Sequence, residues 1–303
     1  MSAPASPDAT SVIDPALRIA AVQLAVSDLP RSVDFYARVL GLQLHSADDD
    51  IARLGGADPE HPALELLALV DPVPAPAHST GLFHVAWLHP SRAALAATVR
   101  RIAGAGWPIE GASDHGVSEA LYLSDPDGLG IEIYADRPSA QWQRPPDGQG
   151  VQMVTLALDI EDLLAQSQDE PTATIAPGTV VGHVHLKVSD VARAEAFYRD
   201  ALGFEKQALI PSAAFLSAGG YHHHIGLNSW QSRGGVPTPP SAPGLRRVDF
   251  ELGSTGALEQ LANRLAQAPT ASPTQMEVAG LVVSDPDDVR LRFAVSGSDN
   301  GDL

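Results

Sequence analysis

Glu132 stands out because a carboxylate between two isoleucines is unusual in a buried strand. The stretch around it alternates, so it predicts a strand with Ile131 and Ile133 on one face and Glu132 with Tyr134 on the other. Either the second face is in contact with water, or the Glu132 carboxylate holds a ligand there. The residues around it must decide between these two possibilities.

The segment 115–134, which ends just after Glu132, predicts a strand, a tight turn and a second strand. Residues 120–124 form an apolar run, and residues 125–128 are Asp-Pro-Asp-Gly. Proline presets φ and glycine can take a positive φ, so this tetrapeptide has the chemistry of a turn. Residues 131–134 then resume an extended pattern.

Composition limits which chemistry and which partners are available. The chain has 303 residues, enough for two domains, and it contains no cysteine. Disulfides, thiolate metal ligands and a cysteine nucleophile are therefore excluded, and a cytoplasmic location is expected. The 19 basic and 37 acidic side chains give a net charge of −18. A chain this acidic lacks the basic footprint of a protein that binds nucleic acid or an anionic membrane.

The chain shows no segment expected to enter a membrane. No apolar run reaches the ~18 residues of a membrane span. The first 15 residues are rich in Ala, Ser and Pro and lack the basic start and apolar core of a signal peptide. We expect residues 1–17 to form a disordered tail.

A first repeat relates the two halves of the chain at an offset of 162 residues. Each copy predicts an alternating strand, 19–26 or 181–188, and then a helix. Asp28 or Asp190 stands where it can cap that helix. The matched residues are Val26-Ser-Asp28, Arg31, Phe35-Tyr36 and Leu40-Gly41 in the first copy and Val188-Ser-Asp190, Arg193, Phe197-Tyr198 and Leu202-Gly203 in the second.

A second repeat lies between the copies of the first, and Ser124-Asp-Pro-Asp127 recurs as Ser284-Asp-Pro-Asp287. The whole chain is therefore expected to be α+β, with four βαββ modules that start near residues 18, 80, 180 and 244. In the second repeat the predicted elements are strands 81–88, 121–124 and 131–135 with helix 92–103, and strands 244–252, 281–284 and 289–295 with helix 257–265.

The composition of the connecting segments suggests where the domains divide. Residues 138–150 are rich in Pro, Gly and Gln, and a short helix is predicted near 159–167. We expect a first domain at 18–137 with modules one and two, a linker at 138–177, a second domain at 178–296 with modules three and four, and a polar tail at 297–303.

The four βαββ modules and the repeated Val-Ser-Asp, Phe-Tyr and Leu-Gly pattern resemble the vicinal-oxygen-chelate (VOC) superfamily, also called the glyoxalase, bleomycin-resistance and dioxygenase superfamily. The resemblance covers residues 18–137 and 178–296. It implies two glyoxalase-like domains with curved mixed sheets around a cavity, into which metal ligands project from the strands.

The resemblance also implies where the ligands stand, namely on the first strands of two paired modules and on the last strand of one of them. In module two these positions hold His84 and Glu132, and in module three the first strand holds His183. His185 lies two residues further on the same face and remains an alternative to His183. Two imidazoles and one carboxylate suit Fe(II) and leave positions open for substrate and dioxygen, with Mn(II) as the alternative metal.

The corresponding positions of the other two modules hold different residues. Module one has Ala21 where module three has His183, and module four has Arg247 and Arg292 where module two has its ligands. Arginine cannot bind a cation. We therefore predict crossed pairing, in which modules two and three form the metal cavity and modules one and four form a structural one. The sequence leaves open whether this pairing occurs within one chain or between chains.

The stretch from His115 to Glu132 is similar to the pattern of extradiol ring-cleaving dioxygenases, which place a second His and a Tyr beside the metal-binding Glu. Here these residues are His115 and Tyr122, while Ser113 is a minor departure from the pattern. The resemblance implies that His115 and Tyr122 donate hydrogen bonds near the substrate oxygens.

A catalytic acid/base is implied within Tyr221-His-His-His224. Extradiol enzymes carry a His-His pair at the start of a strand, and this maps the acid/base onto His224, with His222 and His223 as alternatives. A neutral imidazole can both donate and accept a proton near neutral pH.

Within the superfamily, the arrangement is most similar to two-domain bacterial catechol 2,3-dioxygenases. The resemblance implies an enzyme that inserts O2 into a catechol-type molecule at a non-haem Fe(II). Two alternatives remain open, a redox-neutral glyoxalase-type lyase or isomerase and a metal-free binding or resistance protein. Neither requires the pattern that ends at Glu132. The sequence leaves both a monomer and a homo-oligomer open.

Overall fold

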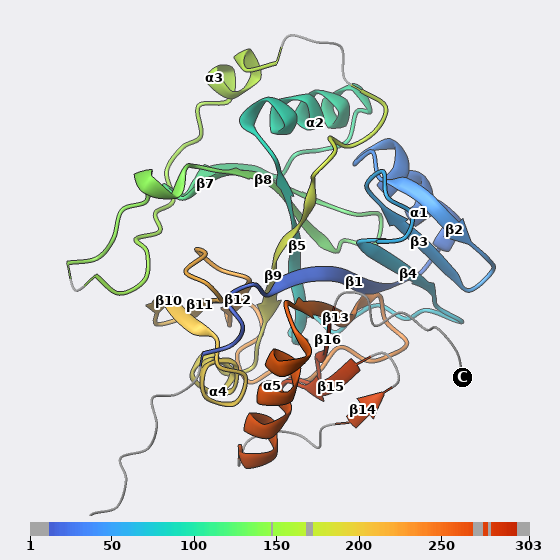
Figure 1. Ribbon diagram of the computed structural model, residues 1–303. Helices are drawn as coiled ribbons and strands as arrows, with labels where there is room; N and C mark the ends of the chain where they lie inside the picture. The colour runs from blue at the N-terminus through green and yellow to red at the C-terminus, as the bar shows by residue number, and fades with distance from the viewer. Residues whose placement is uncertain (1–11, 147, 168–171, 269–274, 278–279, 296–303) are drawn as a thin grey trace, which may run out of the picture.

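The computed structural model describes residues 12–146, 148–167, 172–268, 275–277 and 280–295. They form two eight-stranded sheets that cross near the middle of the molecule, with helices on their outer sides (Figure 1). Both sheets contain parallel and antiparallel neighbours. The predicted α+β class is confirmed. None of the helices in the described ranges has the length and apolar character needed to cross a bilayer.

The two sheets are named here by their central strand pairs. The β1/β13 sheet runs β14 (Gln275–Glu277), β15 (Gly280–Ser284), β16 (Arg290–Val295), β13 (Gly244–Leu252), β1 (Arg18–Val26), β4 (Leu64–Ala68), β3 (Ile51–Gly55) and β2 (Gln43–Ala47). The β5/β9 sheet runs β10 (Glu205–Ile210), β11 (Ala213–Ser217), β12 (Ile225–Asn228), β9 (Val180–Lys187), β5 (Gly81–His89), β8 (Gly130–Asp136), β7 (Ser118–Ser124) and β6 (Gly111–Asp114).

Helices connect these strands. They are α1 (Leu29–Arg38), α2 (Arg92–Gly104), the 3-10 turn η1 (Ser139–Gln141), α3 (Ile160–Ala165), α4 (Val191–Ala196) with the π-helical η2 (Phe197–Ala201), and α5 (Thr255–Gln267).

Strand pairing joins the two halves of the chain. β5 of module two pairs antiparallel with β9 of module three, and β1 of module one pairs antiparallel with β13 of module four. Each sheet therefore combines one module from each half. The predicted crossed pairing is confirmed, and it occurs within one chain.

The repeated aspartates cap the helices as expected. Asp28 accepts a hydrogen bond from the backbone N–H of Arg31 at 3.0 Å, and Asp190 accepts one from Arg193 at 2.9 Å. Such caps stabilise a helix by about 1 kcal/mol, because they satisfy backbone donors that have no partner inside the helix.

The repeated Asp-Pro-Asp turns hold consecutive modules together. Tyr36 of α1 donates to Asp125 in the turn of module two at 3.2 Å, and Tyr198 of η2 donates to Asp285 in the turn of module four at 3.1 Å. Modules adjacent in sequence are thus tied through helix and turn, whereas the sheets pair modules that are distant in sequence.

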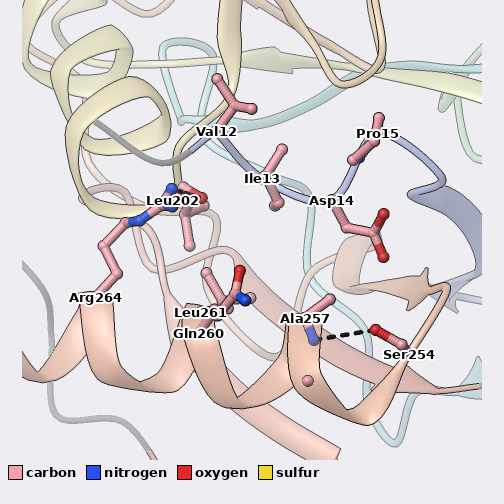
Figure 2. Close-up of a pocket in the computed structure, with 11 residues that line it drawn as sticks. Val12, Ile13, Asp14, Pro15, Leu202, Ser254, Ala257, Gln260, Leu261 and Arg264 are labelled. Carbon is pink, nitrogen blue, oxygen red and sulfur yellow. Dashed lines mark hydrogen bonds between the residues drawn. The ribbon is translucent and has the colours of Figure 1, made fainter. Parts of the chain in front are cut away.

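The predicted N-terminal tail is shorter than expected. Residues 1–11 lie outside the described residues, as does the predicted tail at 297–303. Ile13 and Leu17, however, are buried at 4% exposure, and the N–H of Ile13 donates to the carbonyl of Gly203 at 2.9 Å. Figure 2 shows Val12 to Pro15 passing over α5 and Leu202. Within residues 12–17, Ile13 and Leu17 are therefore anchored, because their side chains join the hydrophobic core.

Candidate metal centre

The register of three neighbouring strands brings the predicted ligands together. Ala86 of β5 lies opposite Glu132 of β8 on one side and opposite His183 of β9 on the other. His84 precedes Ala86 by two residues and therefore shares its face. Alternation along each strand thus turns His84, Glu132 and His183 toward one point.

These three side chains form a compact buried cluster. The Nε2 atoms of His84 and His183 lie 2.9 and 3.2 Å from Oε2 of Glu132. One ligand atom from each residue lies within 4.8 Å of the others. Nε2 of His84 is buried, and its 2.9 Å contact with Glu132 lacks the angles of a hydrogen bond, so this nitrogen makes no hydrogen bond among the described residues. A buried donor set with an unsatisfied nitrogen has the chemistry of a site for a transition metal.

Electrostatics keep Glu132 and His183 in the protonation states that a metal needs. Burial raises the pKa of Glu132, but the imidazoles of His183 and His84 hold that pKa well below its usual range. Burial lowers the pKa of His183 to about 4. The carboxylate is therefore ionised and the His183 imidazole neutral near neutral pH, as ligands must be.

The cluster opens into a cavity of about 410 Å³. Part of the lining is polar, and the apolar part, called the apolar wall here, includes the aromatic rings of Phe83, Phe215 and Trp230. The lining residues are Phe83, His84, Ser113, His115, Val117, Ser118, Tyr122, Glu132, Met153, Val154, Thr155, His183, His185, Ala208, Ile210, Phe215, His223 and Trp230.

His115 and Tyr122 are linked and both line this cavity. Nδ1 of His115 lies 2.8 Å from the carbonyl oxygen of Val154, which can only accept, so Nδ1 carries the proton. Nε2 of His115 lies 2.6 Å from the hydroxyl of Tyr122 and must then accept from it. The ring of Tyr122 lies 5.8 Å from that of His84, which places the pair beside the cluster.

His185 lines the cavity but is not part of the three-residue cluster. The centre of its ring lies 5.2 Å from that of Phe83 and 5.7 Å from that of Trp230, two aromatic residues of the apolar wall. Its Nε2 is buried and has no partner in the described part of the chain.

The structure places the three consecutive histidines in different surroundings. His223 lines the cavity, and its ring lies 4.0 Å from that of His183. His224 does not line the cavity. Its Nδ1 accepts a hydrogen bond from the N–H of Ala218 at 3.1 Å, and burial lowers its pKa to about 3. Of the two, His223 therefore lines the cavity beside the cluster, where His224 was expected. The histidines precede β12, so strand alternation does not set their directions.

Arginine takes the place of metal ligands in the β1/β13 sheet. Arg247 contacts Asp249 at 2.6 Å and Glu65 at 3.0 Å, and Arg292 contacts Asp249 at 2.9 Å. Burial raises the pKa of Glu65, but Arg53 and Arg247 hold it below its usual value. These ion pairs make this face structural, as the two arginines predicted.

Another hollow lies away from both the His84–Glu132–His183 cluster and the ion pairs of Arg247. Figure 2 shows it between the N-terminal segment and α5, with a volume of about 250 Å³. Within the described ranges, the only group of three close His or acidic ligands is the one at His84, Glu132 and His183. The cavity beside that group is therefore the candidate site.

The chain belongs to the Glyoxalase/Bleomycin resistance protein/Dioxygenase superfamily, whose profile matches residues 18–133 and 180–293. Among its relatives, the catechol-2,3-dioxygenase of Bacillus subtilis (strain 168) is 45% identical over 249 residues, which cover 81% of this chain and 86% of that protein. The predicted superfamily and the predicted likeness to catechol 2,3-dioxygenase enzymes are confirmed.

Solved structures agree on the fold. A protein of Bacillus subtilis subsp. subtilis str. 168, provisionally described as a dioxygenase, matches with a TM-score of 0.63 at 13% identity and covers 95% of this chain and 87% of its own. Glyoxalase I from Zea mays matches with a TM-score of 0.56 at 16% identity and covers 93% and 94%. At these identities the matches show the two-domain architecture and leave the reaction open.

Proposed function

We propose that this protein is an extradiol dioxygenase that cleaves the ring of a catechol-type molecule with O2 at a non-haem Fe(II). The observation that carries the proposal is the buried cluster of His84, Glu132 and His183 at the floor of a cavity that also holds the linked pair His115 and Tyr122. The 45% identity to a catechol-2,3-dioxygenase supports it.

The side chains present fit the proposed metal. His84, His183 and Glu132 would hold it, and their two-imidazole, one-carboxylate composition suits Fe(II) or Mn(II) in oxygenases. Nε2 of His84 is buried and makes no hydrogen bond among the described residues, and a metal bound there would give this nitrogen a partner. A ferrous ion bound there would supply the redox chemistry that lets dioxygen react with a catecholate.

The remaining side chains bind substrate and handle protons. Tyr122 lies beside the cluster, and because its hydroxyl proton is donated to Nε2 of His115, its oxygen is left to accept a hydrogen bond from a substrate hydroxyl. Burial and the charge of Glu132 raise the pKa of Tyr122, so its hydroxyl stays protonated and keeps its hydrogen bond to His115. We assign the acid/base role to His223 in place of His224, because His223 lines the cavity and its ring contacts that of His183 at a centroid distance of 4.0 Å. The apolar wall excludes water from the ring of the substrate.

The test is anaerobic reconstitution with Fe(II), followed by addition of catechol and air. We expect a ring-cleavage absorbance and one O2 consumed per catechol. His223→Phe should keep iron and catechol binding but lose turnover, while the matched His224→Phe variant should retain turnover. The reverse pattern would return the role to His224.

Two other results would replace the proposal. Conversion of a substrate without oxygen consumption would indicate a redox-neutral glyoxalase-type enzyme. Ligand binding that is unchanged by removal of the metal, without turnover, would indicate a binding protein. The domain limits at 18–137 and 178–296, a cytoplasmic location and the oligomeric state stay predictions.

A further inference from the structure

His222 connects the cavity to an acidic side chain outside it. Its Nε2 lies 2.8 Å from Oδ1 of Asp136, and its Nδ1 lies 2.8 Å from Nδ1 of His223. The side chain of His222 is fully buried, whereas that of Asp136 is 25% exposed. The three residues thus form one chain of hydrogen bonds that ends at the cavity.

With His222 neutral, the acceptor at one end fixes the direction of both bonds in this chain. An ionised carboxylate can only accept, so Nε2 of His222 carries a proton and donates it to Asp136. In the neutral imidazole, Nδ1 of His222 is then an acceptor. His223 must therefore carry its own proton on Nδ1 and donate it to His222, which leaves Nε2 of His223 unprotonated.

The surroundings of His222 hold it in this orientation. The ring of Tyr221 lies 4.0 Å and that of Trp142 5.4 Å from the ring of His222. The hydroxyl of Tyr221 lies 2.8 Å from that of Tyr134, and it also faces Asp136. An imidazole packed on two sides cannot rotate without disturbing its neighbours, so the hydrogen-bonded arrangement is built into the fold.

We propose that Asp136 and His222 are positioning residues that hold His223 in the tautomer with Nε2 as a free acceptor facing the cavity. This inference rests on the proposed function for the role of His223. Asp136 ends β8, the strand that carries Glu132, so one strand supplies both a metal ligand and the anchor of the acid/base. Neither residue touches the substrate; both act through His223.

The first test compares the turnover of three variants that have been shown to fold and to bind Fe(II) normally. In Asp136→Asn the amide can donate to Nε2 of His222, which reverses the direction of both bonds and puts the proton of His223 on Nε2. We expect kcat to fall by about 10²-fold, within the range of acid/base contributions, with KM for catechol changed less than about threefold. His222→Gln should also lower kcat with KM preserved. The control Asp34→Asn makes the same change from carboxylate to amide in an exposed ion pair on α1, away from both imidazoles, and it should retain kcat within about threefold.

The second test does not depend on activity. Histidine tautomers can be read from ¹⁵N–¹H correlation spectra of the metal-free protein, with signals assigned by comparison with His222→Gln and His223→Gln. We expect His223 to carry its proton on Nδ1 in the wild type and on Nε2 in Asp136→Asn. A wild-type proton on Nε2 of His223 would overturn the inference, and so would a changed tautomer with unchanged kcat. Absence of oxygen uptake by the wild type would instead overturn the proposed function, while the spectra still decide whether Asp136 sets the tautomer.

Discussion

Nε2 of His183 lies 3.2 Å from Oε2 of Glu132, although the two residues are 51 positions apart and belong to different halves of the chain. They meet because β9 and β8 flank β5 from opposite sides. The cluster therefore forms only when β9 pairs with β5, so the candidate site reports directly on the crossed arrangement of the modules.

Replacement of Glu132 should remove the metal. Glu132→Ala deletes the only carboxylate of the cluster, and we expect metal affinity to fall by more than about 100-fold, beyond the 10–100-fold typical of a partner that only supports a ligand. Metal content after dialysis and binding calorimetry measure this. His61→Ala is a suitable control, because His61 is exposed and pairs with the exposed side chain of Asp58, away from the cluster. A Glu132→Ala protein that retains a full equivalent of iron would show that the cluster is not the metal site.

Trp230 should affect the binding of substituted substrates. Its ring is half exposed at the cavity and lies 5.3 Å from Phe83 and 5.7 Å from His185. An aromatic contact contributes about 0.5–1.5 kcal/mol, so Trp230→Ala should raise KM by about 2–10-fold for catechols with an aryl substituent. Steady-state kinetics with aryl-substituted and unsubstituted catechol provide the comparison. Trp230→Phe keeps an aromatic face and should change KM less. Equal KM changes for both substrates would place the substituent elsewhere.

The contact between the first two modules should contribute measurably to stability. The carboxylate of Asp127 is 5% exposed, accepts the N–H of Ser27 at 2.8 Å and also binds the Ser27 hydroxyl and Arg31. Asp127→Ala leaves these donors without their acceptor, so we expect the free energy of unfolding to drop by about 1–3 kcal/mol.

The matched control for this prediction is Asp34→Ala on α1. Asp34 and Arg38 form an exposed pair on one helix face, which contributes about 0.5 kcal/mol or less. Urea unfolding of the two variants gives both values. Equal losses in the two variants would mean that the Asp127 contact does not stabilise the module interface.

His89 should make stability depend on pH. Its imidazole is 1% exposed, and burial lowers its pKa from 6.5 to about 4. Between these values the unfolded chain binds a proton that the folded protein does not bind. The free energy of unfolding therefore falls as pH drops from 6.5 to 4, by about 3 kcal/mol from this residue. In His89→Gln this part of the pH dependence should disappear. Urea titrations at several pH values measure the slope, and an unchanged slope would contradict the assignment.

Local patterns in the sequence predicted most of the helices and strands, and they placed two of the three cluster residues on their strands. Alternation and turn chemistry placed Glu132 and His84 on strands, and the 162-residue repeat located the caps at Asp28 and Asp190, because these features depend on neighbours within a few residues. The two arginines at 247 and 292 were enough to indicate which sheet has no metal ligands.

Three-dimensional packing decided the rest. The burial of Ile13 depends on α5, which lies more than two hundred residues away in sequence and gives no local signal. The direction of each histidine from 222 to 224 depends on Asp136, His183 and Ala218, and these residues come from separate parts of the chain. The sequence by itself determined the strand faces on which His84, Glu132 and His183 lie, because strand periodicity is local, while their role as ligands was implied by the family resemblance and left His185 as an alternative to His183. Only the tertiary structure decided that His223 faces the cavity and His224 does not, because outside a regular strand a side chain points where its distant partners hold it.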